Sequence, residues 1–321
     1  MRAAIVSEIG RLPEPGEVPD PQPGEGEEVV EVLAAPLNPI DINVAAGRFY
    51  GGHPATPYVP GCEGVGRVAG TDGFVWMHGG GLGVKRDGCL AERVAAPADG
   101  VIPVPEGADP ALAGALGIAG VAGWIPLAWR APVRKDDIGL VLGATGTVGL
   151  VAVQAARLLG AARIVAAGRN EEALARTKDA GADAVVRIDG EGDLARRFRE
   201  ACGGRGPTYV VDPLWGAPLA AALDAAATGA RAVNIGQSAG AETTLASSWV
   251  RSKQVEIYGY SNYAVPPEVL RREYARLVQA ALSAELVVEV ERVPLAEVGD
   301  AWRRQSEGAG RKLVVVIENP E

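Results

Sequence analysis

Metal-binding side chains are scarce in this chain. It has two histidines and three cysteines among 321 residues, and these form no CxxC, HExxH or HxxxH pair. Three cysteines cannot build a four-cysteine zinc lobe, and catalytic zinc normally takes three protein ligands. The odd number and wide spacing of the cysteines also argue against a disulfide framework and are typical of a reducing compartment. We therefore expect a cytoplasmic protein that holds no metal.

An excess of positive charge is also absent. The chain has 31 Lys and Arg against 40 Asp and Glu, which gives a net charge of −9. Nucleic acids and anionic membranes attract proteins through clustered positive charge, and no long basic run occurs here. The sequence thus predicts no nucleic-acid partner and no binding to anionic membranes.

Neither an export signal nor a clear membrane span is visible. Ser7-Glu8 interrupts the first apolar residues before a signal peptide could form. The segment Ala111–Trp129 is uncharged, but it is rich in Ala and Gly, contains Pro126 and is closely bracketed by charges. A membrane helix of this length is usually rich in Leu, Ile and Val. The composition favours a buried helical connection between domains.

Phenylalanine is rare and glycine is abundant, with three and 43 residues respectively. In the N-terminal third, glycine and proline break the chain into short apolar runs such as Val29–Leu33. Gly61–Gly70 alternates small and apolar residues, which is typical of a bent barrel strand. We interpret Pro36–Asp41 as a turn and Thr71–Arg86 as a loop of open role. The pattern predicts an antiparallel all-β module.

From Asp136 onward, strand-like and helix-like runs alternate. The expected strands are Ile138–Leu142, Arg163–Ala167, Ala184–Arg187, Tyr209–Val211, Ala232–Ile235 and Val255–Tyr258. The expected helices are Val148–Leu159, Glu171–Ala180, Asp193–Ala201, Ala217–Ala227 and the longer Pro267–Ser283. This alternation, with near-continuous apolar strands, predicts a parallel sheet covered on both faces. The tail is expected to add a strand, a helix and a strand.

The strongest chemical signal is the turn between Gly143 and Gly149. It follows an apolar strand and opens an apolar helix, which is where a dinucleotide-binding fingerprint lies. A glycine at 146 lets the backbone approach a pyrophosphate, and N–H groups at the helix start meet the phosphates. Because Ala144 replaces the first glycine of the fingerprint, a tight turn without a ligand is the alternative. The candidate cofactor-binding residues are Ala144, Thr145, Gly146, Thr147, Val148 and Gly149.

The end of the next strand indicates which dinucleotide binds. An acidic residue about 20 positions after the last glycine binds the ribose of NAD, but Arg169 stands there. A guanidinium pairs well with the 2′-phosphate of NADP. Asn170 is a further candidate, and it also fits the cap of a helix that begins at Glu171. The sequence favours NADP(H), with a solvated helix-end charge as the alternative for Arg169.

Taken together, these segments resemble the medium-chain dehydrogenase/reductase superfamily, and in particular its zinc-independent quinone oxidoreductases. The resemblance covers nearly the whole chain and rests on Leu37–Asp41 with Ala46–Tyr50, Pro60–Gly66, Gly88–Glu92, Gly143–Gly149, Gly160-Ala161, Gly181–Asp183 and Gly310–Val314. It implies an α/β fold class with two domains. A GroES-like β-barrel catalytic domain (residues 1–118 and 260–321) is interrupted by a doubly wound, parallel Rossmann domain that binds NADP (residues 119–259).

Some positions depart from the family pattern. Where zinc-dependent members carry cysteine and histidine ligands, this chain has Asn38 and Cys62. Cys62 alone cannot hold a catalytic zinc, and we expect it to be a small buried residue. Ile188 stands near the position where many quinone reductases carry a cofactor-contacting tyrosine. The resemblance therefore implies hydride transfer without a metal.

The resemblance also implies which residues surround the nicotinamide. Asn38 is a candidate hydrogen-bond donor to substrate or cofactor, or a turn residue, and Tyr50 is a candidate neutral donor. Asp41 is either a capping acid or a general base. Further candidate cofactor contacts, for which ordinary loop or surface roles are the alternative, are Gly236, Gln237, Ser261, Asn262 and Lys312.

The implied activity is NADPH-dependent reduction of quinones or α,β-unsaturated carbonyls, which need little help from a Lewis acid. The partners would be a small-molecule quinone or enone and a second copy of the chain, joined through edge strands such as Val255–Tyr258. Two alternatives remain open, namely an enoyl or ketone reductase of a biosynthetic pathway and a non-catalytic NADPH-binding protein.

Overall fold

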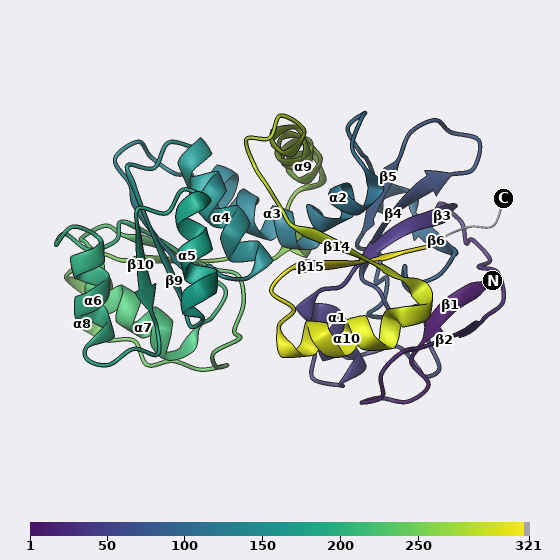
Figure 1. Ribbon diagram of the computed structural model, residues 1–321, viewed down its shortest axis with the longest axis horizontal. Coiled ribbons are helices and arrows are strands. Elements are labelled where there is room, and N and C mark those ends of the chain that lie inside the picture. Colours follow the sequence, from purple (N-terminus) through teal and green to yellow (C-terminus); the bar gives the residue numbers. More distant parts are fainter. Residues whose placement is uncertain (318–321) are drawn as a thin grey trace. The chain divides into compact units, whose positions relative to one another are not determined.

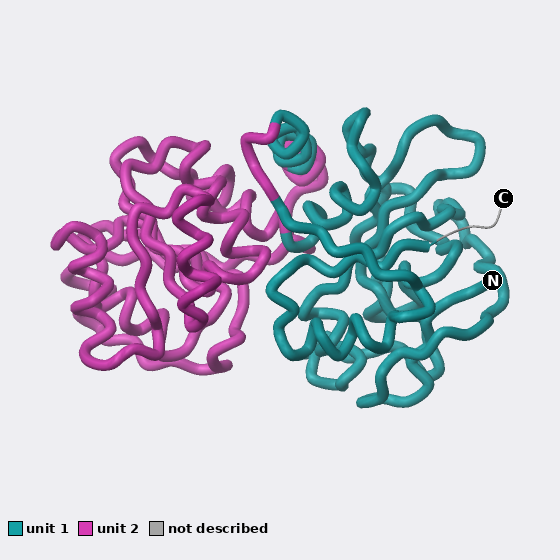
Figure 2. The backbone as a smooth tube through the Cα atoms, in the orientation of Figure 1, with its two compact units in different colours: residues 1–119, 274–283, 288–321 teal, residues 120–273, 284–287 magenta. Residues whose placement is uncertain are grey.

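The computed structural model describes residues 1–317, which divide into two compact units (Figure 2). Unit 1 comprises Met1–Ala119, Tyr274–Ser283 and the chain from Val288 onward. Unit 2 comprises Gly120–Glu273 and Ala284–Val287. The chain thus leaves unit 1 after residue 119 and first returns to it at residue 274. The sequence places the first boundary between residues 118 and 119 and the second between residues 259 and 260.

Unit 2 contains a six-stranded sheet in which every pairing is parallel (Figure 1). The strands are β8 (Ile138–Leu142), β9 (Arg163–Gly168), β10 (Ala184–Arg187), β11 (Tyr209–Asp212), β12 (Arg231–Asn234) and β13 (Glu256–Gly259). Their spatial order is β10-β9-β8-β11-β12-β13. The predicted parallel sheet is confirmed. Because the order reverses between β8 and β11, the carboxyl ends of these two strands flank the position where open α/β sheets bind ligands.

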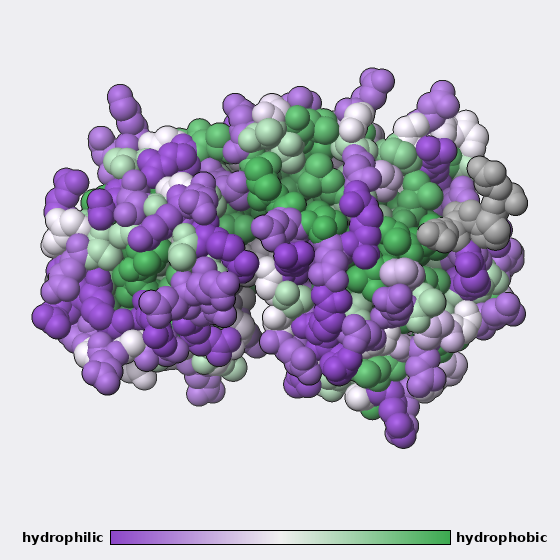
Figure 3. Space-filling view, in the orientation of Figure 1, coloured by the Kyte–Doolittle hydropathy of each residue, from purple (hydrophilic) through white to green (hydrophobic). Residues whose placement is uncertain are grey.

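Helices cover both faces of this sheet. The helices that pack on its strands are α4 (Thr147–Leu158), α5 (Glu171–Asp179), α6 (Leu194–Ala201) and α7 (Gly216–Ala225). The other helical elements of this part of the chain are α3 (Ile118–Ile125), the π-helical η2 (Pro126–Arg130), α8 (Ser247–Arg251), η3 (Asn262–Ala264) and α9 (Pro267–Leu282), which continues into unit 1. Apolar residues of α6 and α7, such as Phe198 and Leu219, share one buried cluster with the strands. Hydrophilic side chains cover much of the visible surface of unit 2 (Figure 3). No helix within residues 1–317 is both long and apolar enough to cross a membrane.

The amino end of this sheet is closed by a buried ion pair. The Arg231 guanidinium donates to the Asp137 carboxylate and, at 2.6 Å, to the carbonyl of Pro132. The second oxygen of Asp137 accepts the hydroxyl of Thr208 at 2.8 Å. The Arg231 guanidinium also lies 5.3 Å from the centre of the Tyr209 ring. Charges and hydrogen-bonding groups at this end are therefore largely used inside the fold.

Unit 1 holds a two-stranded and a seven-stranded sheet. The strands are β1 (Arg2–Ile5), β2 (Glu14–Glu17), β3 (Glu27–Pro36), β4 (Glu63–Val68), β5 (Val75–His78), β6 (Arg93–Pro97), β7 (Val101–Pro103), β14 (Val290–Pro294) and β15 (Lys312–Val316). The pairings are antiparallel except that β14 runs parallel to β15. The helical elements are α1 (Pro39–Ala45), η1 (Ala98–Gly100), α2 (Pro110–Ala115), η4 (Leu295–Glu297) and α10 (Val298–Glu307). The α/β fold class is confirmed.

Two local expectations in unit 1 are wrong. Thr71–Arg86 is not simply a loop, because β5 pairs with β4 and β7 and buries Trp76 and Met77 completely. Pro36–Asp41 is not only a turn, because Pro39 begins helix α1. In both places, glycine or proline beside the element concealed a short segment that long-range packing stabilises.

Candidate active site

The predicted site residues lie in two groups, one in each unit. In unit 2 they follow β8, β9, β12 and β13, and so gather at the carboxyl edge of the parallel sheet. In unit 1, the side chains of Asn38, Asp41 and Lys312 belong to one buried polar cluster, whereas Tyr50 lies on an exposed turn.

The glycine turn of unit 2 brings helix α4 directly onto strand β8. Gly143 adopts a left-handed conformation with φ of 61°, which favours glycine. A Cβ added to Gly149 would lie 2.4 Å from the carbonyl oxygen of Gly143 and 2.6 Å from the Cα of Ala144. Glycine at position 149 is therefore required by the packing of the helix on its own turn.

The start of α4 carries backbone donors that the described chain does not use. Gly146 is the N-cap, and no side chain bonds there. Within residues 1–317, no hydrogen-bond partner is found for the N–H groups of Thr147 and Val148. A Cβ added to Gly146 would meet only the Gly143 carbonyl oxygen, at 3.8 Å, so space is left beside the backbone. Free N–H groups and the helix dipole fit an anionic group, such as the pyrophosphate of a dinucleotide.

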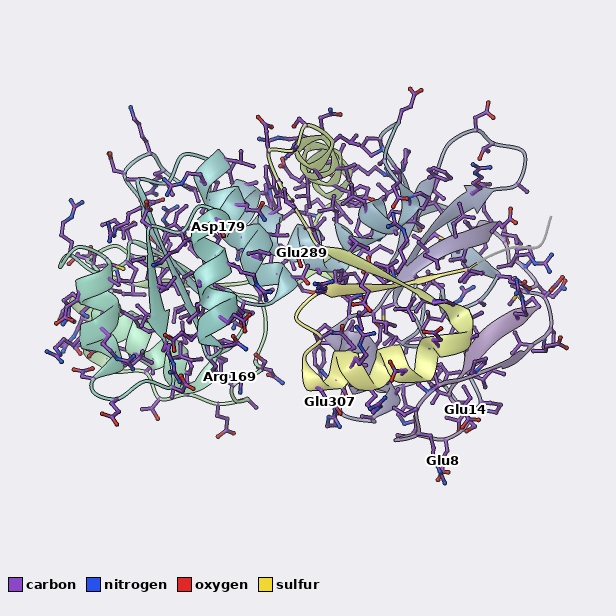
Figure 4. The ribbon with its side chains drawn as sticks, viewed as in Figure 1. Glu8, Glu14, Arg169, Asp179, Glu289 and Glu307 are labelled. Atoms are coloured by element: carbon purple, nitrogen blue, oxygen red, sulfur yellow. The ribbon has the colours of Figure 1, made fainter. Side chains whose placement is uncertain are left out.

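Arg169 extends from the end of β9 into solvent, at the start of α5 (Figure 4). It makes no hydrogen bond or ion pair with any residue of the described chain. The neighbouring Arg187, in contrast, pairs with Asp189 at 3.2 Å and with Glu171 at 3.5 Å. Asn170 caps α5, because its side-chain oxygen accepts the N–H of Ala173 at 2.8 Å. The unpaired guanidinium at 169 therefore fits a phosphate, and the oxygen of Asn170 is already in use.

The loops after β12 and β13 carry the remaining predicted contacts of unit 2. Gly236 is partly buried and Gln237 is exposed, and both follow the last residue of β12. Ser261 and the buried Asn262 follow β13. All four thus reach the same edge of the sheet as the glycine turn.

Sequence reasoning missed two polar residues at this edge, Asp212 and Asn234. They are the last residues of β11 and β12, and they face each other in the strand register. The Asn234 amide nitrogen donates to the Asp212 carboxylate at 2.9 Å. A polar residue that ends an apolar parallel strand was the available signal, since such residues meet at the carboxyl edge.

Glu63 is the centre of the buried polar cluster in unit 1. Its carboxylate is fully buried. One oxygen accepts the Asn38 side-chain amide at 2.7 Å, and the other accepts the Trp76 indole N–H at 2.8 Å and the Ile118 backbone N–H at 2.7 Å. Glu63 therefore ties together β4, β5, the segment before α1 and the start of α3. Glu63 lies within the Pro60–Gly66 motif, but no local pattern in the sequence indicates this role.

Lys312 enters the same cluster from β15. It is 3% exposed, and its ammonium donates to the Asn38 side-chain oxygen at 2.6 Å and to the Leu37 carbonyl at 2.8 Å. The alternative of a surface lysine is therefore wrong. The amide of Asn38 is held on both sides, by Lys312 at its oxygen and by Glu63 at its nitrogen.

Asp41 lies in the first turn of α1. Its carboxylate accepts the backbone N–H of Asn38 at 2.7 Å and that of Cys62 at 2.8 Å. This geometry supports the capping interpretation of Asp41. Cys62 is buried, as expected. Burial, followed by the nearby Asp41 carboxylate, raises the pKa of the Cys62 thiol well above its ordinary value, so the thiol stays protonated and unreactive.

Burial sets the electrostatics of the unit 1 cluster. It raises the pKa of Glu63 to about 7, against the opposing effects of Lys312 and the hydrogen-bond donors. It also raises the pKa of Asp41 and lowers the pKa of Lys312. These directions arise because desolvation penalises every charged form. Burial therefore shifts all three groups toward their neutral forms.

Gly117 leaves the space that the Glu63 carboxylate occupies. A Cβ added at this position would lie 2.0 Å from the carboxylate oxygen and 2.6 Å from the indole nitrogen of Trp76. Glycine at 117 is therefore needed for the contact between Glu63 and the Ile118 N–H.

Tyr50 is 89% exposed, and its ring centre lies 4.5 Å from that of Phe49. Its hydroxyl is free to reach a small molecule in solution, so the predicted donor role is sterically open. Across residues 1–317, no group of three or more His, Cys, Asp or Glu side chains is arranged to hold a metal ion.

The known proteins that this chain resembles include dehydrogenases, reductases and oxidoreductases by name. The family model described as zinc-binding dehydrogenase matches residues 147–282. Prostaglandin reductase-3 of Bos taurus is 29% identical over 295 residues, which are 88% of this chain and 76% of the relative. Quinone oxidoreductase of Homo sapiens is 26% identical over 328 residues, covering 99% of this chain and 98% of the relative. The quinone oxidoreductase of Thermus thermophilus, solved also in complex with NADPH, is 28% identical with a TM-score of 0.79, covering 99% of this chain and 100% of that structure.

Proposed function

We propose that this chain, which is similar to members of the medium-chain dehydrogenase/reductase superfamily, reduces quinones or α,β-unsaturated carbonyls with NADPH. The coarser assignment, an NADP(H)-dependent oxidoreductase, is supported by relatives that are named as reductases or oxidoreductases and by a similar structure that was solved in complex with NADPH. When bound, NADPH supplies the hydride. The acceptor class is the part that we propose.

One observation supports the NADPH part of this function. At the carboxyl edge of the unit 2 sheet, the N–H groups of Thr147 and Val148 and the guanidinium of Arg169 lack partners within the described chain, beside the open space at Gly146. The helix start suits the pyrophosphate, and Arg169 suits the 2′-phosphate. A dinucleotide that carries a 2′-phosphate would satisfy both.

Residues of unit 1 fit the reduction of an acceptor that needs no metal. We assign Tyr50 as the neutral donor to the oxygen on which charge develops, because its hydroxyl is exposed and preorganised donors stabilise such charge. The Asn38 side-chain amide is buried and already bonded to Glu63, Lys312 and the Pro36 carbonyl. We therefore assign Asn38 to positioning the chain before α1 rather than to donating a hydrogen bond to the substrate. Asp41 is assigned to capping rather than to proton abstraction.

The test is an NADPH oxidation assay with a benzoquinone, an alkenal and a saturated aldehyde. Turnover with the quinone or the alkenal, and little with the aldehyde, is the expected result. Turnover with the saturated aldehyde alone would contradict the proposal and favour a ketone or aldehyde reductase. Micromolar NADPH binding without turnover on any acceptor would favour the non-catalytic alternative. Stoichiometric zinc in the purified protein would overturn the metal-free assignment.

We also propose that the protein forms a homodimer. Strand β13 ends the order of the unit 2 sheet, so its outer edge has no neighbouring strand within this sheet. An exposed edge is a template for pairing with another chain. Sedimentation equilibrium at the concentration used in the assay should give twice the mass of the chain, and a monomer there would contradict the proposal.

A further inference from the structure

Asp212 shapes the loop that follows β11. Its carboxylate is fully buried and accepts the backbone N–H groups of Leu214 at 3.0 Å and Trp215 at 2.8 Å. Trp215 has a φ of 57°, a conformation that costs free energy for a residue with a side chain and persists only where the surroundings impose it. Asp212 thus holds this loop in a bent form.

The bent loop lies against the glycine turn. A Cβ added to Gly143 would lie 3.1 Å from the ring of Pro213 and 3.2 Å from the side chain of Leu214. The loop after β11 and the turn proposed to hold the pyrophosphate therefore pack directly on each other.

Asn234 joins this loop to the one after β12. Its amide nitrogen lies within hydrogen-bond distance of the Asp212 carboxylate, the Asp212 carbonyl at 3.2 Å and the Gly236 carbonyl at 2.7 Å. The two loops are bonded again further along, where the Ser238 N–H donates to the Pro213 carbonyl at 3.3 Å and the Ala239 N–H donates to the Leu214 carbonyl at 2.8 Å. One side-chain amide thus fixes where the chain leaves β12.

We propose that Asn234, together with Asp212, is a positioning pair that sets the spacing between the pyrophosphate and nicotinamide ends of the cofactor site. This inference rests on the proposed function, in which the glycine turn holds the pyrophosphate and Gly236-Gln237 hold the nicotinamide side. Neither residue touches the cofactor. Their contacts connect the two loops that do, and they lie away from Arg169, which is assigned to the adenosine end.

The test compares a fragment with the whole cofactor. Adenosine 2′,5′-bisphosphate occupies only the adenosine end, whereas NADPH needs both ends. In Asn234→Ala we expect the affinity for the fragment to stay within about twofold of the wild type, and the affinity for NADPH to fall about tenfold, the effect of losing one or two buried hydrogen bonds. The kcat with a quinone should fall as well, because the hydride donor is held less precisely.

Two controls keep the test decisive. Thr243→Val removes the hydroxyl that donates to the Gly216 carbonyl at 2.9 Å on the same pair of loops, and it should leave both affinities unchanged. If Asn234→Ala does not fold, Asp212→Asn, which places an amide opposite the Asn234 amide, is measured in the same way.

The outcomes separate this inference from the proposed function. Equal losses for the fragment and for NADPH, or no loss for either, in a folded variant would overturn the positioning role. If the wild type binds neither the fragment nor NADPH, the assignment of NADP(H) is instead contradicted. A loss confined to NADPH supports the proposal.

Discussion

The two ends of the unit 2 sheet differ in how many of their polar groups find partners inside the fold. At the amino end, the buried charges of Asp137 and Arg231 meet each other and the groups around them. At the carboxyl end, the Thr147 and Val148 N–H groups and the Arg169 guanidinium find no partner within residues 1–317. The contrast has an exception at each end: the buried Nε of Arg231 has no hydrogen-bond partner in the part of the chain that the structure describes, and Asp212 and Asn234 bond to each other at the carboxyl end. Donors that a fold leaves without partners are available for a ligand, so we expect the amino end mainly to stabilise the unit and the carboxyl end to bind the cofactor.

The largest expected effect concerns the amino end. Arg231→Ala leaves the Asp137 carboxylate buried without its cation, which should lower the free energy of unfolding by about 3–5 kcal/mol. Urea denaturation measures this loss. The matched control is Arg157→Ala, whose partly exposed pair with Asp183 at 2.8 Å should contribute about 0–1 kcal/mol. If the folded Arg231→Ala protein also lost its affinity for NADPH, the separation between the two ends would fail.

The next effect concerns the carboxyl end and should appear in binding alone. Arg169→Ala removes the guanidinium assigned to the 2′-phosphate, at a cost of about 1.5–3 kcal/mol in NADPH affinity, the range for hydrogen bonds to charged groups. Its stability should change little, because the guanidinium makes no hydrogen bond or ion pair within the described chain and only its charge acts on nearby Asp189. Isothermal titration with NADPH and NADH measures both affinities. Tighter binding of NADH than of NADPH by the wild type would contradict the role of Arg169.

Two glycines of the turn between Gly143 and Gly149 differ in what an added methyl group would contact. Gly149→Ala forces a Cβ against the backbone of Gly143 and Ala144, and we expect a loss of about 1–3 kcal/mol in stability. Gly146→Ala has room for the added methyl group in the protein alone, so stability should hold while NADPH affinity falls. Thermal melts with and without NADPH distinguish the two. A Gly146→Ala protein that binds NADPH normally would show that the backbone at 146 does not approach the cofactor.

The smallest effect concerns unit 1, where the Glu63 carboxylate is buried, like the groups at the amino end of the unit 2 sheet, and accepts several hydrogen bonds. Because the pKa of Glu63 is raised from 4.5 to about 7 in the folded protein, the folded chain holds the proton more tightly than the unfolded chain, and stability falls as pH rises through about 7. The loss from this group should be about 1 kcal/mol between about pH 6 and pH 8. Denaturation curves for wild type and Glu63→Gln at both pH values measure it. An equal pH dependence in the two proteins would contradict the raised pKa.

Much of unit 2 could be predicted from the sequence because local patterns determine it. Each β–α step repeats an apolar strand, a helix and a glycine-containing turn, and β8 and β10 begin and end at the expected residues. In unit 1, the short β5 escaped prediction because its partners, β4 and β7, supply the packing that the segment lacks by itself.

The polar clusters were harder to predict for the same reason. Lys312 lies 274 positions after Asn38, and no local pattern indicates that the two side chains meet. Asn234 and Asp212 likewise meet only after two strands have paired. The roles of Arg169 and Tyr50, which depend on a bound molecule rather than on the fold, stay predictions.

The way β15 completes unit 1 has a consequence for the order in which the protein is made. β15 pairs with β3, and Lys312 reaches back to the segment before α1. Unit 2 is nearly continuous in the chain and can fold while the ribosome is still adding residues, since domains generally fold as units during synthesis. β6 pairs with Glu27–Glu31 of β3, but the Ala34–Pro36 end of that strand waits for β15 to leave the exit tunnel. The N-terminal strands of unit 1 are therefore expected to finish folding after unit 2, although they are made before it.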